Sequence, residues 1–371
     1  MNKPIVLCYP HVSTKAADAV AGVLNTRWIG QGPKVDEFEQ EFSQMLGGMP
    51  CAAVGSGTDA LHLAYILANI HDNDEVIAPV FTCTATNIPL LYQRAKVIFA
   101  DINPWTLNID PNDVAARITP NTKAVVCVHY GGLPADLDRL RKLTTQHNIP
   151  LIEDAAHALG GTYQGRMIGS ISEFTIFSFQ AIKHFTTGDG GMLTFSNPEL
   201  MRRARLLRWF GIDRVAKLGG HWNNDITEVG YKYQMTDIAA AMGLAGLQEL
   251  PEILDIRRHL LDTYVANLQG CHGVMLVGTN GDRELPKNHA AWLCTIVVDG
   301  DRVGLERKLA ENNIESGQMH YRNDRYAIFG KRRDDLPFMD SAEARYLVLP
   351  LHTKMTDDDV LRVCDVIRAG W

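Results

Sequence analysis

The chain has 371 residues, of which 46% are apolar and 21% charged, and its formal net charge at pH 7 is −7. This length allows two packed domains, and the composition is ordinary for a globular protein. Without a basic excess to neutralise phosphates, nucleic acid is a poor candidate partner. No apolar run approaches the roughly 18 residues of a membrane span, and residues 1–20 do not resemble a secretion signal. We therefore expect a cytoplasmic protein that binds neither nucleic acids nor membranes.

Seven cysteines are spread along the chain, and none of them form a Cys-x-x-Cys pair. An odd number without metal-binding spacing indicates reduced thiols, and argues against a disulfide framework or a zinc site. We expect no bound metal. The cysteines are Cys8, Cys51, Cys83, Cys127, Cys271, Cys294 and Cys364.

From residue 51 to residue 195, short apolar runs alternate with amphipathic stretches. The runs predict buried strands, and the stretches between them, such as 58–67 and 137–147, predict helices. Strands alternating with helices indicate an α/β fold whose mainly parallel sheet is covered on both faces. Ligands bind to such sheets at the carboxyl ends of the strands. The predicted strands are 75–79, 95–99, 124–128, 150–153, 175–177 and 191–195.

The remaining sequence predicts a smaller C-terminal domain. Residues 235–268 read as long helices with a break near Pro251, because proline lacks the backbone N–H that a helix interior uses. We place the large domain, with an N-terminal arm, at residues 1–250 and the small domain at residues 251–371. The further predicted elements are a strand over 289–298 and helices over 302–312 and 356–369.

Lys183 follows the predicted strand 175–177 and precedes the turn Thr186-Thr187-Gly188-Asp189-Gly190-Gly191. A lysine held among apolar side chains or near another cation loses part of its basicity and can act as an amine nucleophile. The alternative is a surface lysine before a glycine turn. The two segments described next favour a catalytic lysine.

A glycine-rich turn, Gly55-Ser56-Gly57-Thr58-Asp59, joins the apolar residues 52–54 to the predicted helix 58–67. Glycines let backbone amides approach an oxyanion, and the amino terminus of a helix favours negative charge. The turn is therefore a candidate phosphate cradle, although such turns also cap helices without any ligand. The hydroxyl of Ser178 could contact the same phosphate.

Asp154 ends the apolar run 150–153, where an unpaired carboxylate would be costly. Such an aspartate can hold the protonated nitrogen of a pyridine ring and so sustain the ring as an electron sink. The alternative is a cap for a following helix, a common role of aspartate. His157, three residues later, is either a structural histidine or a neighbour of the same ligand.

Several ordered motifs together resemble the DegT/DnrJ/EryC1/StrS family of sugar aminotransferases, which are pyridoxal 5′-phosphate (PLP) enzymes of fold type I. The resemblance covers nearly the whole chain. It implies a large domain with a mainly parallel seven-stranded sheet flanked by helices, and a smaller C-terminal α+β domain. The matching segments are 28–33 with 38–39, 56–61, 74–77, 129–136, 153–157, the segment around Lys183, and 230–237 with 239–241.

The resemblance implies a role for each candidate residue. Lys183 matches the lysine that holds PLP as a Schiff base, and Asp154 matches the partner of the pyridine nitrogen. His157 matches a residue near the ring hydroxyl. The residues that match phosphate contacts are Thr58, Asp59 and Ser178, beside Gly57 of the same turn.

Members of the family are usually homodimers, and a side chain of one subunit reaches the phosphate of the other. The corresponding segment here is 231–234, which lacks the asparagine of the family. Lys232 and Gln234 alternate as in a strand and can point the same way, so either could take its place. Cys83 is a second departure, because the family often has an aromatic residue there that stacks on the cofactor ring.

The resemblance implies a ping-pong transamination. The amino donor, by family resemblance L-glutamate, leaves its amino group on the cofactor as pyridoxamine 5′-phosphate. A keto-sugar linked to a nucleotide then takes up the amino group, in amino-sugar biosynthesis. Trp28, His320 and Tyr321 either face the substrate, as in the family, or are ordinary surface and packing residues.

Three alternatives compete with this interpretation. A sugar dehydratase of the same family uses bound pyridoxamine phosphate, but such relatives have histidine at the position of Lys183. A non-catalytic sensor would not need Lys183, Asp154 and the glycine turn together. A PLP lyase shares the cofactor chemistry, but the segments 129–136 and 231–237 favour the sugar family.

Overall fold

The computed structural model describes residues 3–221, 223, 225–279 and 285–371. At its centre is a seven-stranded sheet, in which β10 runs antiparallel to both neighbours and all other pairs are parallel. This confirms the predicted sheet, and all six predicted strands lie in it. In spatial order the strands are β1 (Cys51–Val54), β10 (Gly191–Phe195), β9 (Phe174–Ser178), β6 (Leu151–Asp154), β5 (Thr122–Val128), β2 (Glu75–Pro79) and β4 (Lys96–Ala100).

Side chains along each strand alternate between two apolar layers, as expected for a sheet covered on both faces. In β5, Val125 and Cys127 belong to one layer, and Ala124 and Val126 belong to the other. The helices of the first layer are α2 (Pro33–Met45), α5 (Pro111–Arg117), α6 (Leu137–His147) and α9 (Asp237–Leu268). The helices of the second layer are α3 (Gly57–Leu67), α4 (Thr84–Tyr92) and α7 (Leu200–Leu207).

The C-terminal part has its own three-stranded antiparallel sheet, with β12 (Cys294–Val298) between β11 (Val274–Leu276) and β14 (Tyr346–Leu349). Helices α10 (Arg302–Glu311) and α12 (Asp357–Arg368) contribute to its core. Ile5 packs in the same core and pairs with Ile314, so the first described residues lie against the C-terminal part. The predicted strand over 289–298 is shorter than expected, since only Cys294–Val298 pairs with neighbours.

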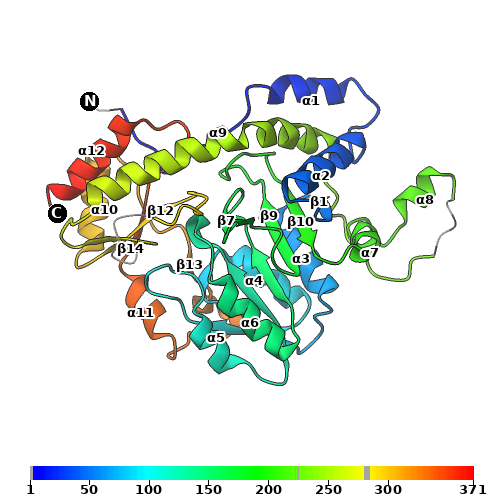
Figure 1. Ribbon diagram of the computed structural model, residues 1–371, viewed down its shortest axis with the longest axis horizontal. Coiled ribbons are helices and arrows are strands. Elements are labelled where there is room, and N and C mark those ends of the chain that lie inside the picture. The colour runs from blue at the N-terminus through cyan, green and yellow to red at the C-terminus, as the bar shows by residue number, and fades with distance from the viewer. Residues whose placement is uncertain (1–2, 222, 224, 280–284) are drawn as a thin grey trace.

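Helix α9 connects the two parts as one continuous helix of 32 residues. The predicted break at Pro251 is therefore wrong. Residues up to Leu254 pack in the core of the large sheet, and residues from Leu260 onward pack in the C-terminal core. Burial on both sides of the proline outweighs the one hydrogen bond that it lacks. Figure 1 shows α9 reaching from one part to the other with α1 (Ala16–Leu24) alongside. A domain boundary near residue 250 stays a prediction.

Shorter elements complete the fold. Helix α8 lies on a segment between α7 and α9 that projects from the body of the molecule at the right of Figure 1. In the described parts of the chain, no helix combines the length and apolar character needed to cross a bilayer. The remaining elements are β3 (Phe81–Thr82) paired with β13 (Tyr321–Arg322), β7 (Thr162–Tyr163) paired with β8 (Arg166–Met167), α8 (Arg214–Leu218) and α11 (Pro337–Glu343).

Asp237, the first residue of α9, also caps the amino terminus of α2. Its carboxylate accepts hydrogen bonds from the N–H groups of Gly32 (2.6 Å), Lys34 (3.1 Å) and Val35 (3.1 Å). The Asp237 residue is only 1% exposed. The Val35 N–H also reaches Gly32 O over 3.2 Å, so the Asp237 carboxylate matters most for the N–H groups of Gly32 and Lys34. The contact ties the two helices together where the chain enters the large domain.

We predict that Asp237→Ala lowers the free energy of unfolding by about 2 kcal/mol, because it removes a cap and leaves buried amides unsatisfied. Denaturant-induced unfolding measures the change. Asp262→Ala, which alters an exposed residue of the same helix, is the matched control and should shift stability by less than about 0.5 kcal/mol. Equal unfolding midpoints for the two variants would show that the cap contributes nothing.

Candidate active site

The loops that carry the predicted site residues meet at one edge of the large sheet. Strands β1, β9 and β6 end at this edge and β10 begins there. Val54 pairs with Gly191, and Gly191 pairs with Ser178, so these residues form one row across three strands. Asp154 ends the neighbouring strand opposite Ile176. In α/β sheets this edge is where ligands bind.

The turn after β1 packs tightly on this row, which explains its glycine residues. A Cβ atom on Gly57 would lie 3.0 Å from the Cβ of Ser178, and one on Gly191 would overlap the backbone of Ser56. Gly57 and Thr58 open the first turn of α3, where N–H groups lack a helical acceptor. The geometry suits the predicted phosphate cradle, because free amides and the helix dipole both favour an anion.

Asp59, which the resemblance assigns to the phosphate, is engaged within the turn itself. Its N–H donates to Ser56 Oγ over 3.0 Å, and a Cβ on Gly55 would come within 2.9 Å of its Oδ2. Burial raises the pKa of Asp59 to about 6, although hydrogen bonds from Ser56 oppose this shift. These contacts give the Asp59 side chain a part in shaping the loop, and a direct contact with phosphate stays a prediction.

Lys183 lies in the loop between β9 and β10 and is held by its neighbours. Its N–H donates to the carbonyl of Gln180 over 2.9 Å, and the indole of Trp292 donates to the carbonyl of Ile182 over 3.1 Å. Lys183 Nζ lies 3.9 Å from the ring centre of Trp292, a cation–π contact. Burial lowers the pKa of Lys183 to about 8, against the opposing charge of Asp154. Part of this amine is therefore unprotonated near neutral pH, as a nucleophile requires.

Asp154 presents a buried carboxylate with ordered partners. Oδ2 accepts a hydrogen bond from the Thr86 hydroxyl over 2.7 Å, and Oδ1 accepts one from the Ala156 N–H over 3.1 Å. Burial raises the pKa of Asp154, whereas these hydrogen bonds and the charges of Lys183 and His129 lower it. The alternative role as a helix cap is wrong, because the chain continues from β6 through turns into β7 and forms no helix there.

His157 takes part in an aromatic stack beside Lys183. Its ring lies 3.8 Å from that of Trp292, centre to centre, with 16° between the planes. Trp292 reaches this position because two glycines let its backbone approach: its N–H donates to Gly131 O over 2.9 Å, and a Cβ on Gly132 would lie 3.0 Å from its nitrogen. Burial and the charge of Lys183 lower the pKa of His157 well below its usual range, so its ring is neutral.

His320 reaches the same stack from the C-terminal part of the chain. Strand β13 carries it there, since Tyr321 pairs with Thr82 of β3. The His320 ring lies 5.2 Å from His157 with 5° between the planes, and burial lowers the pKa of His320 to about 3. Tyr321 is 37% exposed and lies under the guanidinium of Arg325, so it borders the site at the surface.

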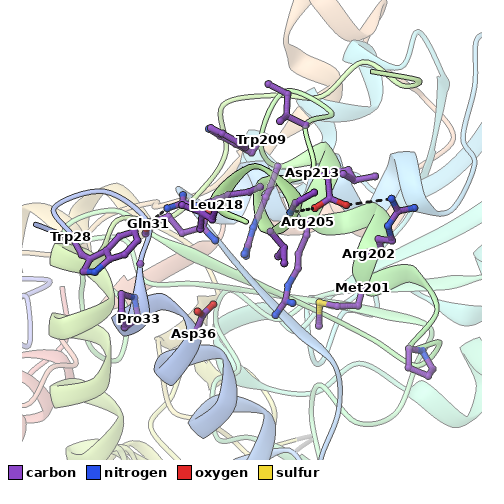
Figure 2. Close-up of a pocket in the computed structure, with 18 of the residues that line it drawn as sticks. Trp28, Gln31, Pro33, Asp36, Met201, Arg202, Arg205, Trp209, Asp213 and Leu218 are labelled. Atoms are coloured by element: carbon purple, nitrogen blue, oxygen red, sulfur yellow. Dashed lines mark hydrogen bonds and ion pairs between the residues drawn. The ribbon is translucent and has the colours of Figure 1, made fainter. Parts of the chain in front are cut away.

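Trp28 lies elsewhere in the chain. It lines a cavity of about 870 Å³ between the start of α2 and the segment that carries α7 and α8. Figure 2 shows Trp28 at one side of this cavity and Trp209, Arg205 and Asp213 at the other. None of the described residues that line it belongs to the cluster around Lys183. Within one chain, therefore, the structure does not bring Trp28 together with the predicted catalytic lysine.

The segment with Lys232 and Gln234 passes the glycine turn of its own chain. The Gly55 N–H donates to Tyr233 O over 2.7 Å, and Gln234 forms a backbone bridge with Val54. Lys232 Nζ lies 5.6 Å from the ring centre of Phe210. Gln234 Oε1 is buried, and it has no hydrogen-bond partner among the described residues of this single chain. That either side chain reaches the phosphate of a partner subunit stays a prediction.

The arrangement fits PLP. A partly buried lysine of lowered pKa, a buried carboxylate and a glycine turn at a helix start lie at one sheet edge, matching the aldehyde, the ring nitrogen and the phosphate of that cofactor. His157 Nδ1 and His320 Nε2 are buried without partners among the described residues, so both remain available to a ligand.

Cys83 is exposed and provides no aromatic surface. In the described ranges, no group of three or more histidine, cysteine or acidic residues is placed to hold a metal ion.

Two residues of the site were missed by the sequence analysis. Trp292 falls in the predicted strand 289–298, and its contact with Lys183 spans more than a hundred residues of sequence, so no local pattern signals it. Thr86 is likewise not signalled by spacing, because Thr82 belongs to β3 and Thr86 to α4, and the turn between them brings the two hydroxyls together.

Comparisons with known proteins show the family and the fold of the chain. A family model described as the DegT/DnrJ/EryC1/StrS aminotransferase family matches residues 10–368. The spore coat polysaccharide biosynthesis protein SpsC of Bacillus subtilis is 35% identical over 97% of this chain and 95% of its own length. The crystal structure of AtS13 from Actinomadura melliaura has a TM-score of 0.93 at 37% identity and 100% coverage of both chains. The sugar aminotransferase CalS13 from Micromonospora echinospora has a TM-score of 0.91 at 32% identity, covering 98% of this chain and 99% of its own.

The lowered pKa of Lys183 makes a testable prediction for protein freed of PLP. Acetylation of Lys183 by limiting acetic anhydride, followed by mass spectrometry of its peptide, should reach half its maximal rate near pH 8. In Asp154→Asn the half-point should move to lower pH, because the carboxylate that favours the charged amine is gone. A half-point near pH 10 in both proteins, as for an exposed lysine, would contradict this account of the site.

Proposed function

The chain belongs to the DegT/DnrJ/EryC1/StrS aminotransferase family, and on that basis we propose that it transfers an amino group from L-glutamate to a nucleotide-linked keto-sugar. The enzyme is a PLP-dependent transaminase. The observation that carries the proposal is the placement of Lys183 beside Trp292 and Asp154 at the carboxyl edge of the sheet. The amino donor and the sugar nucleotide are the proposed part.

When bound, PLP supplies an aldehyde that accepts the amino group and a ring that withdraws electrons. The residues of this chain supply position and proton transfer. With PLP bound, Lys183 Nζ, with a pKa of about 8, would take the proton from the α-carbon of the amino donor as a general base and deliver it, as a general acid, to the cofactor carbon that carries the amino group. Asp154 would accept a hydrogen bond from the ring nitrogen and hold the proton there. Gly57, Thr58 and Ser178 would hold the phosphate, and neutral His157 would face the ring hydroxyl.

A sugar as amino acceptor is supported by the relatives and by the polar residues of the site. SpsC is named for polysaccharide biosynthesis, and CalS13 is described as a sugar aminotransferase. His320 offers an unpartnered Nε2 near Lys183, among the described residues, and suits a hydroxyl or carbonyl oxygen of a sugar ring. Tyr321 lies at the exposed border, where a larger group attached to the sugar would extend.

We predict that the PLP-loaded protein forms 2-oxoglutarate from L-glutamate when supplied with one of a panel of nucleotide-linked 3-keto and 4-keto sugars. Lys183→Ala should reduce this turnover below detection while the circular dichroism spectrum stays unchanged. Mass spectrometry of the sugar should show an amino group in place of the keto oxygen. Loss of water from the sugar without transfer of nitrogen would point to a dehydratase, and no release of 2-oxoglutarate in any mixture would contradict a glutamate-dependent aminotransferase.

We also propose that the working unit is a homodimer with shared active sites. The segment between α7 and α9 projects from the body of the molecule in Figure 1, and it carries exposed apolar side chains. A second copy of the chain could bury these side chains in a dimer interface, because a two-fold axis brings the same patch of both subunits together. Lys232 is exposed on the same segment, where a second copy would reach it. The exposed apolar residues are Phe210, Val215, Leu218, Ile226 and Val229.

Shared sites make a specific demand on mixed dimers. We predict that a subunit with Lys183→Ala, combined with a subunit carrying Lys232→Ala and Gln234→Ala, regains up to about half of wild-type activity per mixed dimer. One site then carries both defects and the other carries none. Native mass spectrometry verifies that mixed dimers form, and a wild-type subunit paired with Lys183→Ala gives the reference value. Each mutant homodimer must first prove inactive on its own. If mixed dimers then form and stay inactive although each homodimer folds, the segment serves its own chain.

A further inference from the structure

A chain of two buried threonine hydroxyls ends on the carboxylate of Asp154. Thr82 Oγ1 and Thr86 Oγ1 lie 2.8 Å apart, and Thr86 Oγ1 lies 2.7 Å from Asp154 Oδ2. Thr86 is fully buried and Thr82 is 2% exposed, so water does not substitute for either group. The backbone around them is also fixed, because the Tyr65 hydroxyl donates to Thr86 O over 2.7 Å and Asn323 Nδ2 donates to Thr82 O over 2.8 Å.

The direction of the hydrogen bonds follows from the charge of Asp154. An ionised carboxylate only accepts hydrogen bonds, and a threonine hydroxyl has a single proton to donate. When Asp154 is ionised, Thr86 must donate to it, and Thr82 must then donate to Thr86. Each step stabilises the negative charge, and hydrogen bonds to a charged group are among the stronger ones.

We propose that Thr86, oriented by Thr82, is a positioning residue that keeps the shared proton on the ring nitrogen of PLP and away from Asp154. A buried carboxylate facing a pyridine nitrogen has one proton to share with it. A hydrogen bond from Thr86 to the carboxylate stabilises the ionised form and so moves that proton toward the ring. A protonated ring withdraws electrons better, so the hydroxyl chain acts on the chemistry without touching the substrate.

Among the groups around Asp154, Thr86 contributes most to lowering the pKa of its carboxyl. Burial raises the pKa of the Asp154 carboxyl, and the Thr86 hydrogen bond is the largest of the effects that lower it. Ala156 N–H, Lys183 and His129 act in the same direction more weakly. Lys183 has a second task in proton transfer, and its charge varies during the reaction. Tyr65 and Cys127 are also near, but burial raises the pKa of each well above its usual range, so both stay neutral.

The test measures whether the proton shared by Asp154 and PLP lies on the ring nitrogen. The holoenzyme is loaded with PLP that is ¹⁵N-labelled at the ring nitrogen, and the chemical shift of that nitrogen is recorded by NMR. Thr86→Val keeps the shape and removes the hydroxyl. Its resonance should move from the wild-type position toward that of Asp154→Ala, which serves as the unprotonated reference. Thr86→Ser should restore the wild-type resonance. The kcat of Thr86→Val should fall about 10- to 100-fold with little change in KM, the size of a lost hydrogen bond to a charged group.

Each possible result either supports or overturns the role proposed for Thr86. A wild-type resonance in Thr86→Val, with the shifted one in Asp154→Ala, would overturn the role of Thr86. An unshifted Asp154→Ala would show instead that Asp154 does not face the ring nitrogen. If Thr86→Val fails to fold or to bind PLP, Thr82→Val takes its place. Its resonance should move in the same direction by a smaller amount, and no movement there would overturn the proposal. None of these readings depends on which sugar or amino donor the enzyme uses.

Discussion

The buried carboxylate of Asp154 constrains the residues around it, because a charge that is 4% exposed is costly unless other groups compensate for it. The compensation comes from separate segments: a hydroxyl of α4, a backbone amide after β6, and the amine of Lys183 after β9. Each of these groups must be held in place for the others to work. The strand order delivers them, since β6 and β9 are parallel neighbours that end at the same edge.

Close backbone approaches at glycine residues bring the two parts of the chain together at this edge. Gly131 and Gly132 admit the backbone of Trp292, and Trp292 then closes over His157 and Lys183. Gly191 admits the turn that begins α3. The segments that resemble family motifs are therefore of two kinds. Some place a side chain at the ligand. Others have a glycine, whose missing Cβ atom lets a segment distant in sequence pack closely.

Local patterns predicted those features of the fold and site that depend on neighbours in sequence. Each of the six apolar runs became a strand, because burial on both faces of a parallel sheet demands such runs. Lys183 follows a strand and Asp154 ends one, and these positions predicted both as candidates at the edge where such strands end. The pattern was misleading at Pro251, where packing of α9 in two cores outweighs the missing hydrogen bond. Trp292 had no local signal at all, because its role depends on a contact between the two parts.

The balance of forces on Lys183 suits an amine that must both take and return a proton. Burial lowers its pKa, whereas the charge of Asp154 and the face of Trp292 both favour the protonated form. The result is a pKa of about 8, below the ordinary value of a lysine, so that part of the amine is unprotonated near neutral pH. A more basic lysine would hold its proton too tightly to act as a base, and a less basic one would be a poor acid on the return step. Transamination runs the same proton transfer in opposite directions for the donor and the acceptor, so a value near neutrality serves both halves.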